Sequence, residues 1–226
     1  MGKLNDKVAI ITGGSGGIGE AAAKRYLAEG AKVVLVDLDG EALASVAQRL
    51  GDGVAVYAGD ITTPEANAAI VALAIERFGG VDIFLANAGI EGTVAPLTTQ
   101  SVEVFDRVMA VNVKSTFLTT KHAIQLLLSQ PTSAIVNISS IAALRYIGYP
   151  CLSYSASKGA INQATQNIAI QYAERGLRAN CVLPGLMDTP QIRHFVTSGY
   201  KGAMEAMLRK RNSICPTGQM GNAWDV

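Results

Sequence analysis

The sequence has few of the features that would direct it to a particular partner or compartment. Its three cysteines, Cys151, Cys181 and Cys215, lack C-x-x-C spacing, which excludes a zinc knuckle and argues against a disulfide framework. The net charge is +1, and no basic block offers an electrostatic footprint for nucleic acid. We therefore expect reduced thiols, a cytoplasmic location, no metal and a small-molecule partner.

Long hydrophobic runs are also missing. The first residues, MGKLNDKVAIITGG, contain no apolar segment of signal-peptide or membrane-spanning length, and Asp6 stands where a myristoylation signal needs Ser or Thr. Hydrophobic residues nevertheless make up 49% of the chain, which is enough for a substantial core. Without a linker, repeat or low-complexity stretch, residues 1–226 are predicted to form a single domain with no membrane association.

Short apolar runs rich in valine and isoleucine alternate with segments of helical period. The runs span residues 7–12, 31–37, 53–58, 81–86, 133–139 and 177–183. Strands that helices cover on both faces read as continuous apolar segments of this kind. In two of these segments, residues spaced alternately four and three apart form one helix face. The first set is Val113, Phe117, Thr120, Ile124 and Leu127, and the second is Tyr154, Lys158, Ile161, Thr165, Ile168 and Tyr172. The alternation predicts an α/β fold with a Rossmann-type, doubly wound parallel sheet.

A glycine-rich segment, TGGSGGIGE, follows the first predicted strand and opens a helix. Glycines between Thr12 and Gly19 let the backbone turn tightly and approach a pyrophosphate, whose charge the N–H groups and dipole of the new helix would meet. The alternative is a glycine-rich turn that binds nothing.

The second predicted strand ends at Asp37, 20 residues beyond Gly17. A carboxylate there can accept hydrogen bonds from both ribose hydroxyls of an adenosine. It would repel a 2′-phosphate, and Gly16 offers no cation to bind one, so the sequence favours NAD over NADP. A solvated acid at the strand end is the alternative interpretation.

Tyr154 and Lys158 lie four residues apart in YSASK, which places them on the same face of a helix. An ammonium close to a phenol lowers the pKa of the phenol, although desolvation opposes the effect. The pair therefore predicts a tyrosine that exchanges a proton with an alcohol or carbonyl oxygen. Ser139 and Ser140, at the end of the fifth predicted strand, are both candidates to hold that oxygen. The alternative for the pair is a turn or a helix cap.

These motifs, in this order, resemble a short-chain dehydrogenase/reductase. The matching segments are TGGSGGIG, Asp37, GDI at 59–61, ANAG at 86–89, Asn112, the serine pair, YSASK and PGLMDTP. The resemblance implies that Ser140 fixes the substrate oxygen, Tyr154 is the acid/base, and Lys158 binds the nicotinamide ribose and lowers the tyrosine pKa. It implies that Asn112 distorts its helix and anchors a water in a proton relay.

The resemblance and the strand-end positions together predict the coenzyme contacts. The predicted residues are Gly13, Ser15, Gly16, Gly17, Ile18, Gly19, Asp37, Leu38, Asp60, Ile61, Asn87, Ala88, Gly89, Tyr154, Lys158, Pro184, Gly185 and Thr189. Three of these interpretations have structural alternatives. The alternatives are that Asn87 bridges two strands, that Pro184-Gly185 is only a turn, and that Asn112, in the catalytic set, is only a helix cap.

Further expectations concern the rest of the chain. The resemblance implies another helix and a seventh strand, and by this pattern the chain, which ends at Val226, lacks both. It also implies a homodimer or homotetramer formed through helices near 101–129 and 153–175. Residues 190–215 are predicted to form a substrate lid, with His194 and Phe195 as candidate contacts. Tyr149, Leu144 and Arg145 are candidates for shaping the substrate pocket, whereas His122 is expected to be structural.

The sequence thus predicts an NAD-dependent oxidoreductase that interconverts a secondary alcohol and a ketone. One alternative is an NAD-binding structural or regulatory protein without turnover. Another is a dehydratase or epimerase, because the same phenol and nicotinamide can serve a transient oxidation.

Overall fold

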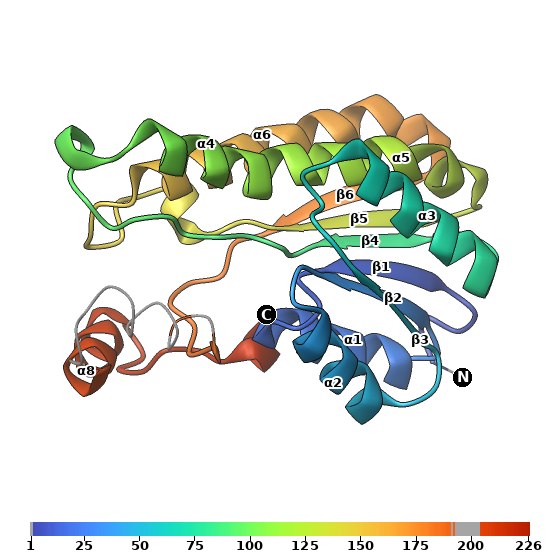
Figure 1. The fold of residues 1–226 in the computed structure, drawn as a ribbon, viewed down its shortest axis with the longest axis horizontal. Helices are drawn as coiled ribbons and strands as arrows, with labels where there is room; N and C mark the ends of the chain where they lie inside the picture. The colour runs from blue at the N-terminus through green and yellow to red at the C-terminus, as the bar shows by residue number, and fades with distance from the viewer. Residues whose placement is uncertain (1, 191, 193–203) are drawn as a thin grey trace.

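The chain forms one parallel sheet in the strand order β3-β2-β1-β4-β5-β6 (Figure 1). This is a computed structural model, and it describes residues 2–190, 192 and 204–226. The strands are β1 (Val8–Thr12), β2 (Lys32–Asp37), β3 (Val54–Ala58), β4 (Ile83–Ala86), β5 (Ser133–Ile138) and β6 (Leu177–Val182). Each lies within the apolar run predicted for it, so the doubly wound α/β prediction is confirmed.

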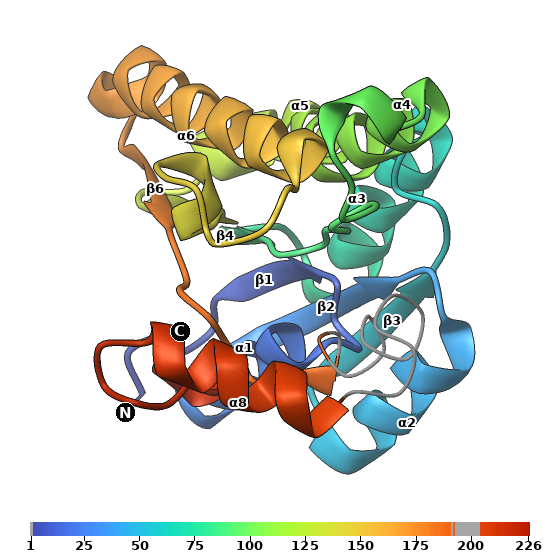
Figure 2. The same cartoon turned by 90° about the vertical axis from the view of Figure 1, so that its left-hand side faces the viewer.

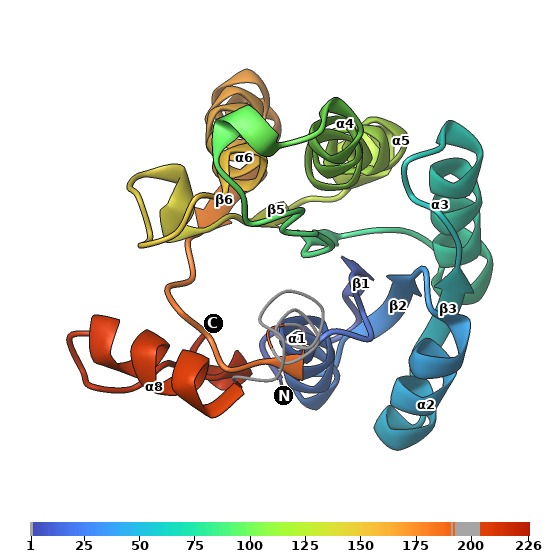
Figure 3. The same ribbon diagram turned by 60° about the vertical axis from the view of Figure 1, so that its left-hand side comes forward.

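Helices cover both faces of this sheet (Figures 1 and 3). On one side lie α1 (Gly17–Ala28), α2 (Gly40–Leu50) and α8 (Met204–Ile214). On the other lie α3 (Pro64–Phe78), α4 (Val102–Met109), α5 (Ser115–Ser129) and α6 (Leu152–Tyr172). A π-helical turn, η2 (Ala110–Lys114), joins α4 to α5, and the 3₁₀ turns are η1 (Leu97–Thr99), η3 (Ile141–Ala143), η4 (Ala173–Arg175) and η5 (Ala223–Asp225).

Local signals in the sequence set the ends of α3. The Thr63 side chain accepts a hydrogen bond from the N–H of Ala66, Pro64 occupies the first turn, and Gly79 ends the helix in the left-handed conformation. Each residue suits its place, since a hydroxyl satisfies a free N–H, proline needs no donor there, and glycine tolerates φ of +88°.

The core consists of two apolar layers, one on each face of the sheet. Neighbouring residues of β1 serve different layers: Ile10 packs with Phe84 and Leu127 under α3 and α5, and Ile11 packs with Leu35 and Leu43 under α1 and α2. All six side chains are fully buried. Burial of each such side chain contributes about 1.5–3 kcal/mol, which explains why β1 and β2 are apolar between their end residues.

The carboxyl ends of the six parallel strands meet at one edge of the sheet. The chain order reverses between β1 and β4, which are paired through Ala9 with Ile83 and Ile11 with Leu85. Loops that leave adjacent strands in opposite directions open a crevice at such a point, where α/β sheets bind their ligands. The glycine turn after β1 and the segment after β4 therefore face each other across this crevice.

The segment after β6 returns to the α1 side of the sheet (Figure 2). Met187 and Gly221 form a parallel bridge, and the ammonium of Lys24 in α1 lies 5.7 Å from the centre of the Trp224 ring. Within the described part of the chain, β6 pairs only with β5 and so forms one edge of the sheet. In the same residues, no helix has the length and apolar character needed to cross a membrane.

Candidate active site

The turn after β1 forms a backbone cradle at the carboxyl edge of the sheet. Gly13 has a φ of +67°, in the left-handed region that favours glycine. A Cβ on Gly19 would lie 2.1 Å from the carbonyl oxygen of Gly13, so only glycine lets α1 begin this close to the turn. The N-cap residue Gly16 has no side chain with which to cap the helix. The first N–H groups of α1 are thus available to an anion such as a pyrophosphate.

Asp37 closes β2 directly above this cradle. Its Oδ2 accepts hydrogen bonds from the Ser15 hydroxyl at 2.6 Å and the Ser15 N–H at 3.0 Å, and its Oδ1 accepts one from the Leu38 N–H at 2.7 Å. These bonds fix the carboxylate at the mouth of the cradle, where the sequence placed the ribose acceptor.

A cavity of about 500 Å³ lies over the cradle and runs along the strand ends. The predicted coenzyme residues that line it are Gly13, Ser15, Gly16, Gly17, Ile18, Asp37, Leu38, Asp60, Ile61, Asn87, Ala88, Gly89 and Thr189. Gly19 does not line it and instead allows the close packing of α1. The glycine cradle, the free helix N-terminus and the carboxylate fit a dinucleotide with a pyrophosphate and an adenosine ribose.

Arg107 also lines this cavity, and sequence reasoning missed it. Its guanidinium lies 3.5 Å from Oδ2 of Asp60, which lines the same cavity. Hydrogen bonding from Thr62 holds the pKa of Asp60 below its usual range, and Arg107 acts in the same direction. Nothing in the sequence around Arg107 forms a motif, because the residue reaches the cavity only through the packing of α4.

Asn87 bridges strands, as one interpretation of the sequence proposed, and it also lines the cavity described above. Its Nδ2 donates to the carbonyl oxygens of Thr12 and Gly13 at 3.0 Å each, and its N–H donates to the Thr12 hydroxyl. The residue therefore ties the end of β4 to the glycine turn and holds the crevice in shape.

Asn112 lies in the π-helical turn between α4 and α5, as the resemblance to the family implied. Its Oδ1 accepts from the Ile90 N–H at 2.8 Å, and its Nδ2 donates to the Ile90 carbonyl and the Ser157 hydroxyl at 2.9 Å each. Asn112 thus connects the segment after β4 to α6, and it does not act as a helix cap. π-helical turns within α-helices often mark functional positions.

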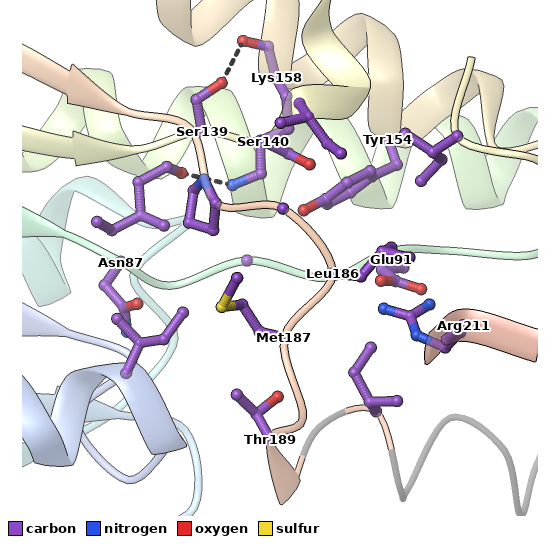
Figure 4. A pocket seen from close by; sticks show the side chains of 18 of the residues that line it. Asn87, Glu91, Ser139, Ser140, Tyr154, Lys158, Leu186, Met187, Thr189 and Arg211 are labelled. Carbon is purple, nitrogen blue, oxygen red and sulfur yellow. Dashed lines mark hydrogen bonds between the residues drawn. The ribbon is translucent and has the colours of Figure 1, made fainter. Parts of the chain in front are cut away.

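Lys158 is buried beneath the site, with only 4% of its surface exposed. Its Nζ donates to the carbonyl oxygen of Ile138 at 2.8 Å and lies 5.6 Å from the centre of the Tyr154 ring (Figure 4). Burial lowers the pKa of Lys158 to about 8. The ammonium therefore lies over the face of the tyrosine ring.

The structure distinguishes the two serines at the end of β5. The Ser139 hydroxyl donates to the carbonyl oxygen of Lys158 at 3.1 Å (Figure 4). The side chain of Ser140 hydrogen-bonds Tyr154 and also accepts from the Ala142 N–H at 3.1 Å. Ser140 is thus the serine whose side chain contacts the tyrosine.

The structure contradicts the expectation that Lys158 brings the pKa of Tyr154 toward neutrality. Burial raises the pKa of Tyr154, and the carboxylate of Glu91 raises it further, while the hydrogen bond from Ser140 lowers it. The sequence spacing gave the closeness of cation and phenol correctly. It gave no measure of desolvation and no sign of the nearby acid.

A second cavity, of about 100 Å³, adjoins the first. Ile18, Asn87, Gly89 and Thr189 line both cavities, and the predicted Ser140, Tyr154, Lys158, Pro184 and Gly185 line the second. The second cavity also contains Glu91, Tyr149 and Arg211. Tyr149 was a candidate for this role, whereas Glu91 and Arg211 were missed.

Two other candidates for the substrate pocket were wrong. Leu144 and Arg145 follow the 3₁₀ turn η3 and are exposed, Leu144 to 73%, and neither lines the cavity. The tight turn after Ser140 directs this segment outward. His194 and Phe195 lie outside the described residues, as do 191 and the rest of 193–203 in the predicted lid at 190–215. His122 is half-buried in α5, away from the site.

The fold and this pair of connected cavities define a dinucleotide-binding α/β protein of the Rossmann type. The model of the short chain dehydrogenase family matches residues 7–198, and the chain belongs to this family. It is therefore an oxidoreductase of the class that acts on CH–OH groups with NAD(H) or NADP(H).

Relatives of known activity differ in their substrates. The chain is 42% identical over 192 residues to 2-(R)-hydroxypropyl-CoM dehydrogenase of Xanthobacter autotrophicus, covering 81% of this chain and 76% of the relative. It is 34% identical over 197 residues to levodione reductase of Leifsonia aquatica, covering 85% and 73%.

Solved structures agree with the fold. A crystal structure of levodione reductase superposes with a TM-score of 0.93 at 29% identity, covering 99% of this chain and 88% of that one. The 3-ketoacyl-(acyl-carrier-protein) reductase of Brucella melitensis, solved in complex with NADH, superposes with a TM-score of 0.89 at 32% identity, covering 99% and 88%.

Proposed function

We propose that this protein is an NAD(H)-dependent oxidoreductase that interconverts a secondary alcohol and a ketone, with Tyr154 as its acid/base. The observation that carries the proposal is the meeting of Tyr154, Ser140 and Lys158 in a cavity continuous with the dinucleotide cavity. The relatives named above, a dehydrogenase and reductases, support the same reaction type.

In this proposal the chain handles the proton of the reaction. Ser140 and Tyr154 hold the substrate oxygen, and during oxidation the phenolate of Tyr154 takes the hydroxyl proton as the C–O bond becomes a carbonyl. When bound, the nicotinamide supplies the acceptor for the hydride and its two electrons. In reduction, Tyr154 returns a proton to the carbonyl oxygen. Lys158 lies over the Tyr154 ring and would bind the nicotinamide ribose, and Asn112 positions the helix that carries Tyr154 and Lys158 through its bond to Ser157.

The preference for NAD rests on Asp37. Its carboxylate at the end of β2 suits two ribose hydroxyls and would repel a 2′-phosphate. Among the described residues that line this end of the cavity, Leu38 and Asp39 beside it add no cation. The NADH in the Brucella melitensis relative is consistent with this preference.

A Tyr154→Phe comparison tests the proposed reaction. Wild-type protein and variant are assayed by NADH absorbance against a broad panel of secondary alcohols and ketones. We expect the variant to lose about 10³-fold in kcat/KM, within the range that general acid/base groups contribute. Tyr146→Phe is the control because this tyrosine is 72% exposed. Turnover that does not depend on Tyr154, or no turnover by the wild-type protein, would refute the proposed function.

We further propose that residues 1–226 act as one dinucleotide-binding and catalytic domain, in the cytoplasm, as a homodimer or homotetramer. The three cysteines are free, which suits a reducing compartment. An apolar groove between α5 and α6 contains Phe117, 62% exposed, from the helix face that the sequence predicted. Phe117→Glu should lower the mass measured by light scattering, whereas exposed Leu144→Glu should not. An unchanged assembly would exclude this face.

A further inference from the structure

The substrate cavity has a charged end that the proposed proton transfer does not use. Glu91 follows β4, Tyr149 lies between η3 and α6, and Arg211 belongs to α8. All three line the cavity, and Figure 4 shows Glu91 and Arg211 close together on one side of Tyr154. Tyr149 contacts Arg211 through its hydroxyl. The opposite side of the cavity holds Lys158 and the strand ends.

Glu91 carries hydrogen-bonding capacity that the described part of the protein does not fill. Its Oε2 is buried and has no hydrogen-bond partner there. Burial raises the pKa of this carboxyl group, while the cations of Arg211 and Lys158 oppose the rise. A buried oxygen without a partner costs about 1–3 kcal/mol, so a group that reaches it from a ligand gains binding energy. Glu91 is therefore poised to bind something that enters the cavity.

Arg211 faces Glu91 across the same end of the cavity, and its own bonds to the protein are weak. Its Nε donates to the sulfur of Met220 at 3.3 Å, and its Nη1 donates to the Tyr149 hydroxyl at 3.5 Å. Sulfur is a poor acceptor, and 3.5 Å is long for a hydrogen bond. A guanidinium has five N–H donors, so Arg211 has donors to offer an oxygen of the substrate.

The two opposite charges restrict which group fits between them. A carboxylate or phosphate of the substrate would pair with Arg211 but lie against Glu91, and an ammonium would have the reverse conflict. A hydroxyl group satisfies both side chains, because it accepts from the guanidinium and donates to the carboxylate. If Glu91 is protonated, the hydroxyl oxygen accepts from it instead.

Building on the proposed function, the geometry points to an uncharged substrate that carries a second hydroxyl group, bound between Glu91 and Arg211, in addition to its reacting carbinol or carbonyl. Glu91 and Arg211 then determine specificity and take no part in the proton transfer. A substrate without the second hydroxyl leaves the buried carboxyl oxygen unpaired and is discriminated against.

A matched set of ring alcohols tests this assignment. The probes are cyclohexanol, the 1,2-, 1,3- and 1,4-cyclohexanediols, 3-hydroxycyclohexanecarboxylate and 3-aminocyclohexanol, each assayed for NAD reduction by the wild-type protein. We expect at least one diol to exceed cyclohexanol tenfold or more in kcat/KM, and to exceed both charged analogues. Equal values for cyclohexanol and every diol, or a preference for either charged analogue, would overturn the inference.

Variants of the two side chains sharpen the test, with the diol-to-cyclohexanol ratio measured within each variant so that a general effect on Tyr154 cancels. Glu91→Met and Arg211→Met should each reduce that ratio about tenfold. Glu91→Gln keeps a hydrogen-bonding group without the charge, so it should retain most of the ratio and improve turnover of the carboxylate analogue. The controls are Glu205→Gln and Arg209→Met, which alter an exposed ion pair on α8. Unchanged ratios in both methionine variants would contradict the assignment.

Binding measurements separate this inference from the proposed function. In Tyr154→Phe protein with NAD, calorimetry should show tighter binding of the preferred diol than of cyclohexanol, and Glu91→Met in that background should remove the difference. If the wild-type protein turns over none of the alcohols but the variant still binds the diol more tightly, only the proposed function is refuted. Equal binding of diol and cyclohexanol would refute the inference even if cyclohexanol is oxidised.

Discussion

The dinucleotide cavity and the substrate cavity are adjacent but are built in different ways. The first is lined by short continuous segments, residues 13–18, 36–39, 59–61 and 87–90, in which glycines and backbone groups dominate. The second depends on side chains from separate elements, including Glu91, Tyr149, Tyr154 and Arg211. A coenzyme site fixed by the backbone tolerates little change, whereas a substrate site made of side chains can be altered one residue at a time.

The carboxylates of the two cavities show the same contrast. Asp37 is held by three hydrogen bonds from Ser15 and Leu38, so its position is determined before any ligand binds. Glu91 has a buried oxygen without a partner in the described residues. The coenzyme carboxylate is preorganised by the fold, and the substrate carboxyl depends on its ligand for a partner.

The largest effect is expected from adding a methyl group to the backbone cradle, which tests whether the backbone fixes the coenzyme site. Gly19→Ala places a Cβ 2.1 Å from the Gly13 carbonyl oxygen, so the turn must move. We expect NAD affinity to fall at least 100-fold in calorimetry and the unfolding free energy to fall by about 2–4 kcal/mol. Gly159→Ala in α6 is the control, since its Cβ would meet nothing within 4 Å. Normal NAD binding by Gly19→Ala would show that the cradle is not used.

The two serines test the substrate cavity at the next level of effect. Ser140→Ala removes the hydroxyl beside Tyr154 and should lower kcat/KM about 100-fold with little change in NAD affinity. Ser139→Ala removes a bond to the Lys158 carbonyl, and its main effect should be a loss of about 1 kcal/mol in unfolding free energy. A larger kinetic loss in Ser139→Ala than in Ser140→Ala would reverse the assignment.

Asp37→Asn asks whether the preorganised carboxylate selects the coenzyme through its charge. Without the charge, repulsion of a 2′-phosphate is relieved, and the preference for NAD over NADP should narrow about tenfold, or about 1.4 kcal/mol. The ratio of the Kd values for NADP and NAD measures this preference in the wild type and in each variant. Asp39→Asn keeps its N-cap role at α2 and should change the ratio less than threefold. Tighter binding of NADP than NAD by the wild type would contradict this use of Asp37.

Glu91→Gln has the smallest expected effect, and it appears in the pH profile. The Glu91 carboxylate raises the pKa of Tyr154, so its removal lowers that pKa. Alcohol oxidation needs the phenolate, so its rise in kcat/KM should begin at lower pH in the variant. The exposed Glu103→Gln in α4 should leave the profile unchanged. A shift of the Glu91→Gln profile to higher pH would show that Glu91 does not act on the tyrosine.

Sequence reasoning did best where function depends on a short continuous segment. The six strands, the glycine turn, Asp37 at its strand end and the shared face of Tyr154 and Lys158 all follow from spacing alone, and the structure reproduces them. The period of a strand, two residues, or of a helix, 3.6 residues, determines which side chains share a face. Ligands of parallel α/β sheets bind at the carboxyl ends of the strands, which predicts where the site lies.

What the sequence missed depends on packing between distant segments. Glu91 and Arg211 belong to no motif, and only the position of α8 brings them together. The pKa of Tyr154 was misjudged because desolvation depends on the surrounding atoms, which no spacing reveals. Leu144 was placed in the pocket from its closeness in sequence to Ser140, but the intervening turn directs it to solvent.

The π-helical turn at Ala110–Lys114 sets the rotational phase of everything after it. Such a turn closes i→i+5 bonds, so it holds one residue more than an α-helical turn and rotates the following helix by about 100° relative to an unbroken one. Loss of any single residue from this stretch would leave a regular helix that is easier to form. It would also swing the amide of Asn112 away from Ile90 and misalign α5 with α6, so natural length variation should avoid this stretch.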